Sequence, residues 1–285
     1  MGFAETVGLG AIAGSTIFIG LPIGRLRILD ARMRVGLAMF SVGILAFIFM
    51  DVSKHGEAIL ETTLTRYQAH TASFGHLFGL FGLLALGFTL GTAGISAAER
   101  WLRARRLAPL AGGEAAATLD AEEIARAGAT ADGARIRSLQ TAMCIAAAIG
   151  LHNFAEGLAI GVSAKAGAVT LATVLIIGFG LHNATEGFGI VGPLGDVRPS
   201  WSWLGLAGIV AGGPTFLGTI VGYQLHSQSL ELTFYALAGG AVLYVIGEIW
   251  TGMRRYGHHT LGLYMIAAGF LAGVATDLVV AYGGG

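Results

Sequence analysis

The sequence predicts an all-α integral membrane protein with eight transmembrane helices. Of its 285 residues, 54% are hydrophobic and 12% are charged, whereas soluble domains carry about 25% charged residues. Eight apolar stretches are long enough for the roughly 20 residues that a helix needs to cross a bilayer. The 46 glycines fit the same class, because transmembrane helices pack closely through small residues.

The eight expected spans belong to one transmembrane domain that covers residues 1–285. Their bounds are 5–24, 35–53, 74–95, 139–163, 168–191, 203–225, 232–252 and 259–281. Residues 96–138, rich in Ala, Arg and Glu, form the longest break and are predicted to be a polar loop. The N-terminus lacks the basic region of a cleavable signal peptide, so none is expected. The sole cysteine, Cys144, lies in an apolar run, which argues against a disulfide framework and a cysteine-type zinc site.

The distribution of basic residues predicts how these spans are oriented. The odd-numbered connections hold 14 of the 17 lysines and arginines, and the other side of the membrane would hold Lys54, Arg66 and Lys165. Cytoplasmic loops carry the excess of positive charge in membrane proteins. We therefore expect a multi-pass protein of the plasma membrane, with both termini outside and the 96–138 loop in the cytoplasm.

Spans 1–3 and 6–8 show an internal repeat. Gly43 aligns with Gly240 and Asp51 with Glu248 at an offset of 197, and spans 1 and 6 align at an offset of 198. The two sets of three start on opposite sides of the membrane, so the repeat would be inverted. The predicted arrangement is 3+2+3, with spans 4 and 5 as a hairpin outside the repeat; chance alignment of glycine-rich helices is the alternative. Inverted repeats are common in secondary transporters, which hold their substrate near the midplane.

The hairpin carries one motif twice, as GLHNFAEG at 150–157 and GLHNATEG at 180–187. Residues four apart share one face of a helix, so His152 faces the same way as Glu156, and His182 the same way as Glu186. A charged acid near the bilayer centre costs about 2.5–3.5 kcal/mol. Because Lys165 is the one basic residue between Arg137 and Arg198, a bound cation is the expected compensating charge.

The ligand types indicate which cation would bind. Two imidazoles and two carboxylates suit Zn²⁺, Fe²⁺ or Mn²⁺, whereas Ca²⁺ and Mg²⁺ prefer oxygen ligands alone. Asn153 and Asn183 would add weaker amide-oxygen ligands or contacts to the ligands. The repeat partners Asp51 and Glu248 would lie near the two mouths of a path through this site, although each is also explained as an ordinary interfacial acid.

Eight spans, termini outside, a polar loop between spans 3 and 4 and H-N-x-x-E-G in spans 4 and 5 together resemble the ZIP (Zrt/Irt-like) family of divalent metal transporters. The similarity covers essentially the whole chain and is closest to the prokaryotic GufA-like branch. The resemblance implies a transport site, often binuclear, in spans 4 and 5. Its primary ligands would be His152, Glu156, His182 and Glu186, with Asn153 and Asn183 nearer a second ion.

Three positions depart from the family pattern. Ala155 and Thr185 stand where the family has proline, so these two helices should be less kinked. Gly213 stands before Pro214 where many members have glutamate. A ligand of the second site is thus missing, which implies one ion or a second ion held more weakly.

The expected function is transport of a divalent metal, Zn²⁺ first and Cd²⁺, Fe²⁺ or Mn²⁺ as alternatives. A metal-dependent intramembrane hydrolase and a metal sensor without flux are the competing classes. We expect no enzyme activity, no catalytic residues and no cofactor, because the metal is the substrate. The expected partners are the metal ion and the lipid bilayer, with a second copy of the chain as a candidate and no nucleic acid.

Overall fold

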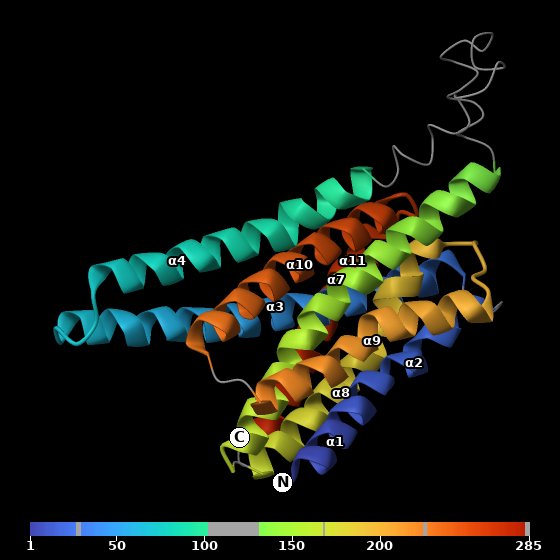
Figure 1. Cartoon of the computed structure of the whole chain (residues 1–285). Helices are drawn as coiled ribbons and strands as arrows, with labels where there is room; N and C mark the ends of the chain where they lie inside the picture. Colours follow the sequence, from blue (N-terminus) through green and yellow to red (C-terminus); the bar gives the residue numbers. More distant parts are fainter. Residues whose placement is uncertain (27–29, 102–130, 168, 225–226, 283–285) are drawn as a thin grey trace, which may run out of the picture.

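The computed structural model describes residues 1–26, 30–101, 131–167, 169–224 and 227–282. Every secondary-structure element in these ranges is helical (Figure 1), which confirms the predicted all-α class. Seven helical segments are long and apolar enough to cross a membrane. Helix α8 (Val169–Val191) stands at the predicted fifth span but is not among those seven, so the count of eight stays a prediction. Residues 102–130 of the predicted 96–138 loop lie outside the described residues.

The first three segments run up to the predicted loop. They comprise α1 (Phe3–Ser15), α2 (Ile17–Gly20), the 3-10 turn η1 (Leu21–Arg25), α3 (Ala31–Gln68), α4 (Phe74–Thr89) and the π-turn η2 (Leu90–Gly94). The helical segment that begins with α4 continues to Trp101. After the loop come α7 (Ala131–Lys165), α8, the 3-10 turn η4 (Gly192–Leu194), α9 (Trp201–Gln224), α10 (Gln228–Arg254) and α11 (His259–Tyr282).

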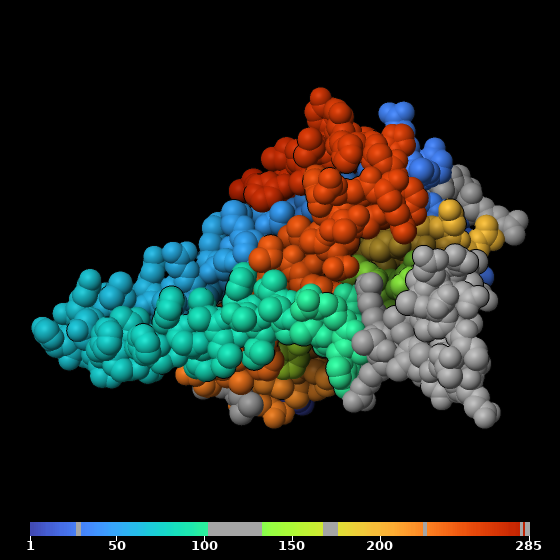
Figure 2. Space-filling view, turned by 90° about the horizontal axis from the view of Figure 1, so that it is seen from above, coloured from blue at the N-terminus to red at the C-terminus, as the bar shows by residue number. Residues whose placement is uncertain are grey.

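Helix α3 is longer than the span expected at 35–53. Its 38 residues extend about 57 Å at 1.5 Å per residue, well beyond a bilayer core of about 30 Å. Asp30 caps its first turn by accepting from the Met33 amide at 2.7 Å, and no proline interrupts the polar stretch after residue 53. Hydropathy marks where a helix can meet lipid, not where it ends. The far ends of α3 and α4 project beyond the rest of the bundle (Figures 1 and 2).

Contacts between glycines and neighbouring backbones recur in the two halves of the chain. Gly43 of α3 packs on α11 around Gly269, and Gly240 of α10 packs on η2 around Gly91. In both cases a Cβ on the first glycine would collide with the same three backbone atoms. The first is the carbonyl oxygen of the residue three positions before the second glycine. The other two are the Cα of that second glycine and the amide nitrogen of the residue that follows it. The predicted repeat between spans 2–3 and 7–8 is therefore visible in how the helices pack.

Helices α1 and α9 cross on the axis of this repeat. A Cβ on Gly14 would collide with the Gly212 carbonyl oxygen, and a Cβ on Gly212 with the Gly14 carbonyl oxygen. Gly10 lies against Thr219 while Gly14 lies against Gly212, so α1 and α9 run in opposite directions. An inverted repeat requires this antiparallel arrangement, and α1 and α9 lie side by side in Figure 1.

Candidate metal centre

Helices α7 and α8 carry the two motifs and extend the repeat to the hairpin. The Asn153 side-chain amide donates to the Ala211 carbonyl oxygen at 3.0 Å, and that of Asn183 donates to the Ala13 carbonyl oxygen at 3.2 Å. Ala13 and Ala211 are themselves 198 positions apart. Helix α7 thus packs on α9 as α8 packs on α1, so the packing of the hairpin follows the symmetry of the two flanking repeats.

The glycine that follows each motif glutamate permits this packing. A Cβ at Gly157 would collide with the Thr215 carbonyl oxygen of α9, and a Cβ at Gly187 would lie 2.8 Å from the Ile17 carbonyl oxygen of α2. Both glycines therefore bring the motif helices against neighbouring backbone. The close approach fixes the rotation of α7 and α8, and with it the direction of the motif side chains.

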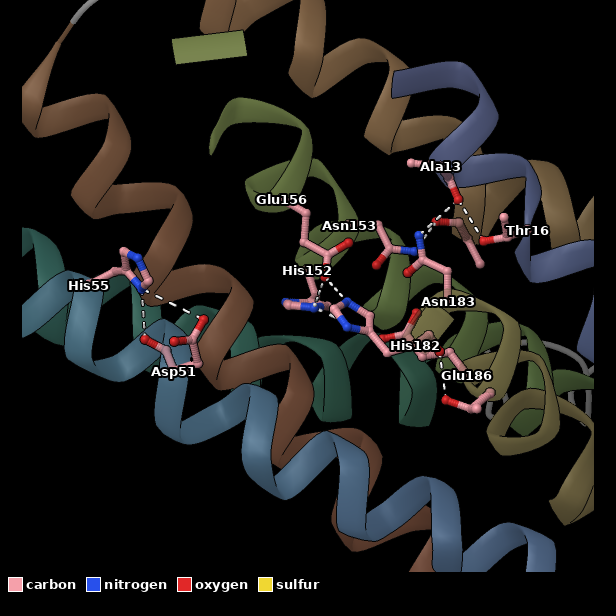
Figure 3. A network of polar contacts seen from close by, with 12 residues as sticks. Ala13, Thr16, Asp51, His55, His152, Asn153, Glu156, His182, Asn183 and Glu186 are labelled. Carbon is pink, nitrogen blue, oxygen red and sulfur yellow. Dashed lines mark hydrogen bonds and ion pairs between the residues drawn. The ribbon is translucent and has the colours of Figure 1, made fainter. Parts of the chain in front are cut away.

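His152, Glu156 and His182 form the centre of the candidate site (Figure 3). The His152 Nε2 atom lies 3.0 Å from Glu156 Oε1, and the His182 Nε2 atom also contacts Glu156 Oε1. One ligand atom from each of the three residues lies within 4.8 Å of the other two. His152 and Glu156 are 2% and 5% exposed, so an ion held here would be almost removed from solvent.

Glu186 lies beside this trio and is not part of it. Its Oε1 atom is 3.9 Å from His152 Nε2, and the residue is 1% exposed. The two glutamates are equivalent in sequence, yet Glu156 contacts both histidines and Glu186 approaches one of them. The structure therefore brings three of the four predicted primary ligands into one group, with the fourth within a small movement.

Several buried polar atoms in and around the trio have no hydrogen-bond partner among the residues that the structure describes. They are His152 Nδ1, Asn153 Oδ1, Glu156 Oε2, Asn183 Oδ1, both carboxylate oxygens of Glu186, and Thr215 Oγ1. Buried polar groups in proteins are normally hydrogen-bonded, and leaving one unpaired costs free energy. Most of these atoms are oxygen acceptors. Such a set is suited to a cation, which would supply the missing positive charge.

A cavity of about 360 Å³ connects the trio to one end of the bundle. His152, Glu156 and His182 line its deep part, and Asp51 lies further out on α3. His55, one turn beyond Asp51, has its Nδ1 atom 3.8 Å from an Asp51 carboxylate oxygen, as Figure 3 shows. The predicted path residue Asp51 therefore faces a route to the site. We refer to this end as the open end.

Glu248, the other predicted path residue, lies elsewhere. It is half-buried on α10 and does not line this cavity. The cavities found at the opposite end, each about 20 Å³, contain none of the motif residues. We refer to that end as the closed end.

Three residues of the cavity wall were not predicted to face the path. His55, Glu231 and Asp277 line it together with Asp51, and none of the three was among the predicted site residues. Asp51 and His55 are one helical turn apart, and this spacing could have predicted that His55 faces the path together with Asp51. Glu231 and Asp277 depend on how α10 and α11 pack against α3, which no local pattern reveals.

The chain is similar to known metal transporters over part of its length. Residues 112–246, which contain both motifs, match the family model of the ZIP zinc transporter. The zinc transporter ZupT of Clostridium perfringens (strain 13 / Type A) is 37% identical over 142 residues, which make up 47% of this chain and 48% of that protein. The match thus spans about half the length of that relative. Both matches are to transporters and not to enzymes, and the chain is similar to ZIP zinc transporters over about half of its length.

Proposed function

We propose that the chain carries a divalent transition-metal cation across a membrane, with Zn²⁺ as the first candidate and Cd²⁺, Fe²⁺ or Mn²⁺ as alternatives. The observation that carries this proposal is the buried group of His152, Glu156 and His182 at the deep end of the cavity. The match to the ZIP family model and the similarity to a zinc transporter of Clostridium perfringens support it.

The charge balance favours a cation at this position. Within the described part of the chain, the ion pairs of Glu156 and Glu186 are with histidines. Two buried carboxylates without a lysine or arginine beside them are costly in a membrane. Imidazole nitrogens together with carboxylate oxygens are ligands for Zn²⁺ and for Fe²⁺ or Mn²⁺. Without thiolate ligands, the ion can leave as well as bind.

The direction of the path follows from the excess of arginine in the odd-numbered connections. We infer that both termini and the open end face the outside of the plasma membrane. Asp51, Glu231 and Asp277 would then attract cations from the outside, because clefts lined by charge of one sign concentrate the opposite ion. Glu248 would lie towards the cytoplasm.

The competing classes gain no support from the site. A hydrolase would need a general base beside a metal-bound water, and both comparisons lead to transporters. A second copy of the chain stays a proposed partner. Helices α4 and α11 leave large apolar side chains exposed, among them Phe78 and Leu271, and either lipid or another subunit would cover them.

Uptake into proteoliposomes tests the proposal. Zn²⁺, Cd²⁺, Mn²⁺ and Fe²⁺ should each be offered to wild type, to Glu156→Ala and to Glu61→Ala, an exposed carboxylate on the projecting part of α3. We expect wild type and Glu61→Ala to take up Zn²⁺, and Glu156→Ala to lose uptake by at least about tenfold, as losses at a metal site usually do. Equal uptake by all three proteins would refute the proposal.

A further inference from the structure

The repeat relates the open cavity to a packed region at the closed end. Asp51 of the cavity corresponds to Glu248 at the offset of 197. Gly269 and Gly91 occupy equivalent positions at the two glycine crossings. Asp277 lies eight residues after Gly269 and Glu99 lies eight residues after Gly91, so Asp277 corresponds to Glu99. The acidic pair of the open end thus has a counterpart pair at the closed end. Glu99 accepts a hydrogen bond from the Tyr244 hydroxyl of α10, and Glu248 follows Tyr244 by four residues on the same helix.

The counterparts of other cavity residues are packed against each other. A Cβ on Gly189 would lie 3.2 Å from the Ile249 side chain, and one on Gly192 would lie 3.0 Å from the Ala38 Cβ. The two motifs are 30 positions apart, so Gly189 and Gly192 correspond to Ala159 and Val162. At the offset of 197, Ile249 and Ala38 correspond to Val52 and Tyr235, and all four counterparts line the open cavity. What is a solvent-accessible cavity at one end is therefore a closed contact at the other, where α8 and the following turn η4 pack against α10 and α3.

Glu99 joins three helices within this closed region. It lies near the end of the segment Phe74–Trp101 and is 5% exposed. The Tyr244 hydroxyl donates to Glu99 Oε2 at 2.7 Å, and the Thr141 hydroxyl of α7 donates to Glu99 Oε1 at 3.1 Å. Both carboxylate oxygens are thus used. The π-turn η2 precedes Glu99 in the same segment, and such turns occur often at functional sites.

We propose that Glu99, Tyr244 and Thr141 form a latch that holds the closed end shut, and that the latch must break before a metal can leave by that end. The inference rests on the proposed transport function. The latch ties α7, which carries the first motif, to α10 and to the segment of α4. Helix α10 belongs both to the latch and to the closed contact with α8, so it is held against α8 for as long as the latch ties it to α7 and to the α4 segment. Loss of one hydrogen bond to a carboxylate should favour the open form by about tenfold or more.

The sole cysteine of the sequence reports on this opening. Cys144 follows Thr141 by three residues on α7 and is half-buried. In purified protein without metal, N-ethylmaleimide should label Cys144 about tenfold faster in Tyr244→Phe and in Thr141→Val than in wild type. Thr141→Ser, which keeps the hydroxyl, and Tyr264→Phe, at an exposed tyrosine of α11, should label at the wild-type rate.

A second reporter separates a latch from general loosening. Ser163 lines the open cavity, so Ser163→Cys in a Cys144→Ala background reports on that end. If opening of one end closes the other, Tyr244→Phe should slow labelling of this cysteine. Faster labelling at both ends, or unchanged labelling of Cys144 in both Tyr244→Phe and Thr141→Val, would overturn the latch. Because no metal is present, these outcomes are independent of the uptake assay that tests transport.

Discussion

At the scale of single residues, the two motif glutamates are identical in sequence context and different in position. Glu156 contacts His152 and His182, whereas the nearest ion-pair contact of Glu186 is 3.9 Å long. Spacing alone identified all four candidate ligands, because His and Glu one turn apart must share a helix face. It could not rank them, since the ranking depends on how α7 and α8 are rotated against their neighbours.

This difference predicts unequal effects on metal affinity. Glu156→Gln should weaken Zn²⁺ binding by more than about 100-fold, because it removes the carboxylate shared by both histidines, and Glu186→Gln by about 10- to 100-fold, as expected for a group beside the ligands. Calorimetric titration of the purified protein measures both, with Glu61→Gln as the matched exposed control. Equal losses in the two variants would contradict the arrangement.

Gly213 sets the expected number of ions. A Cβ at Gly213 would meet one atom within 4 Å, a methyl carbon of Ile209 at 3.9 Å, so a larger side chain fits there without a backbone clash. Since this glycine stands where many ZIP proteins have a glutamate ligand, titration should give one tight Zn²⁺ per chain, or a second that binds more weakly. If the wild-type chain binds two Zn²⁺ ions with equal affinity, the glycine at position 213 does not remove a metal ligand.

At the scale of helices, glycines predicted the membrane class, and the structure shows what they do at particular crossings. Gly43 and Gly240 let paired helices approach until backbones touch, whereas a Cβ on Gly247 would meet nothing within 4 Å. The sequence showed the repeat because these glycines recur at a fixed offset. It did not show that α3 continues to Gln68, because the polar residues beyond position 53 end the hydropathy signal and not the helix.

Replacing these glycines tests the crossings. Gly43→Ala and Gly240→Ala should each destabilise the protein by about 1–3 kcal/mol, the usual cost of overpacking, and by similar amounts because the repeat gives both the same contacts. Gly247→Ala, on the same helix as Gly240, should be neutral or stabilising by about 1 kcal/mol, since alanine favours helix over glycine. Thermal unfolding in detergent measures all three. Stability unchanged at Gly43 and Gly240 would argue against backbone contact there.

At the scale of the whole molecule, the cavity opens at one end and the basic residues gather at the other. Asp51, Glu231 and Asp277 line the open end, while Arg34 pairs with Asp196 at 3.4 Å and Arg255 donates to the Pro193 carbonyl oxygen at 3.2 Å near the closed end. The charge asymmetry along the sequence predicted an orientation. It could not predict which end is open, because that depends on the packing of α3, α10 and α11 around the motif helices.

The orientation predicts which introduced cysteines an impermeant thiol reagent can reach in intact cells. In a Cys144→Ala background, Thr62→Cys lies on the exposed projecting part of α3 and should be labelled, because the open end faces outwards. Ala134→Cys, exposed near the start of α7, should be protected until the cells are permeabilised, since the arginine-rich connections are retained in the cytoplasm. Labelling of Ala134→Cys and protection of Thr62→Cys in intact cells would reverse the orientation. The cavity would then open to the cytoplasm, and Asp51 would lie at the exit of the path.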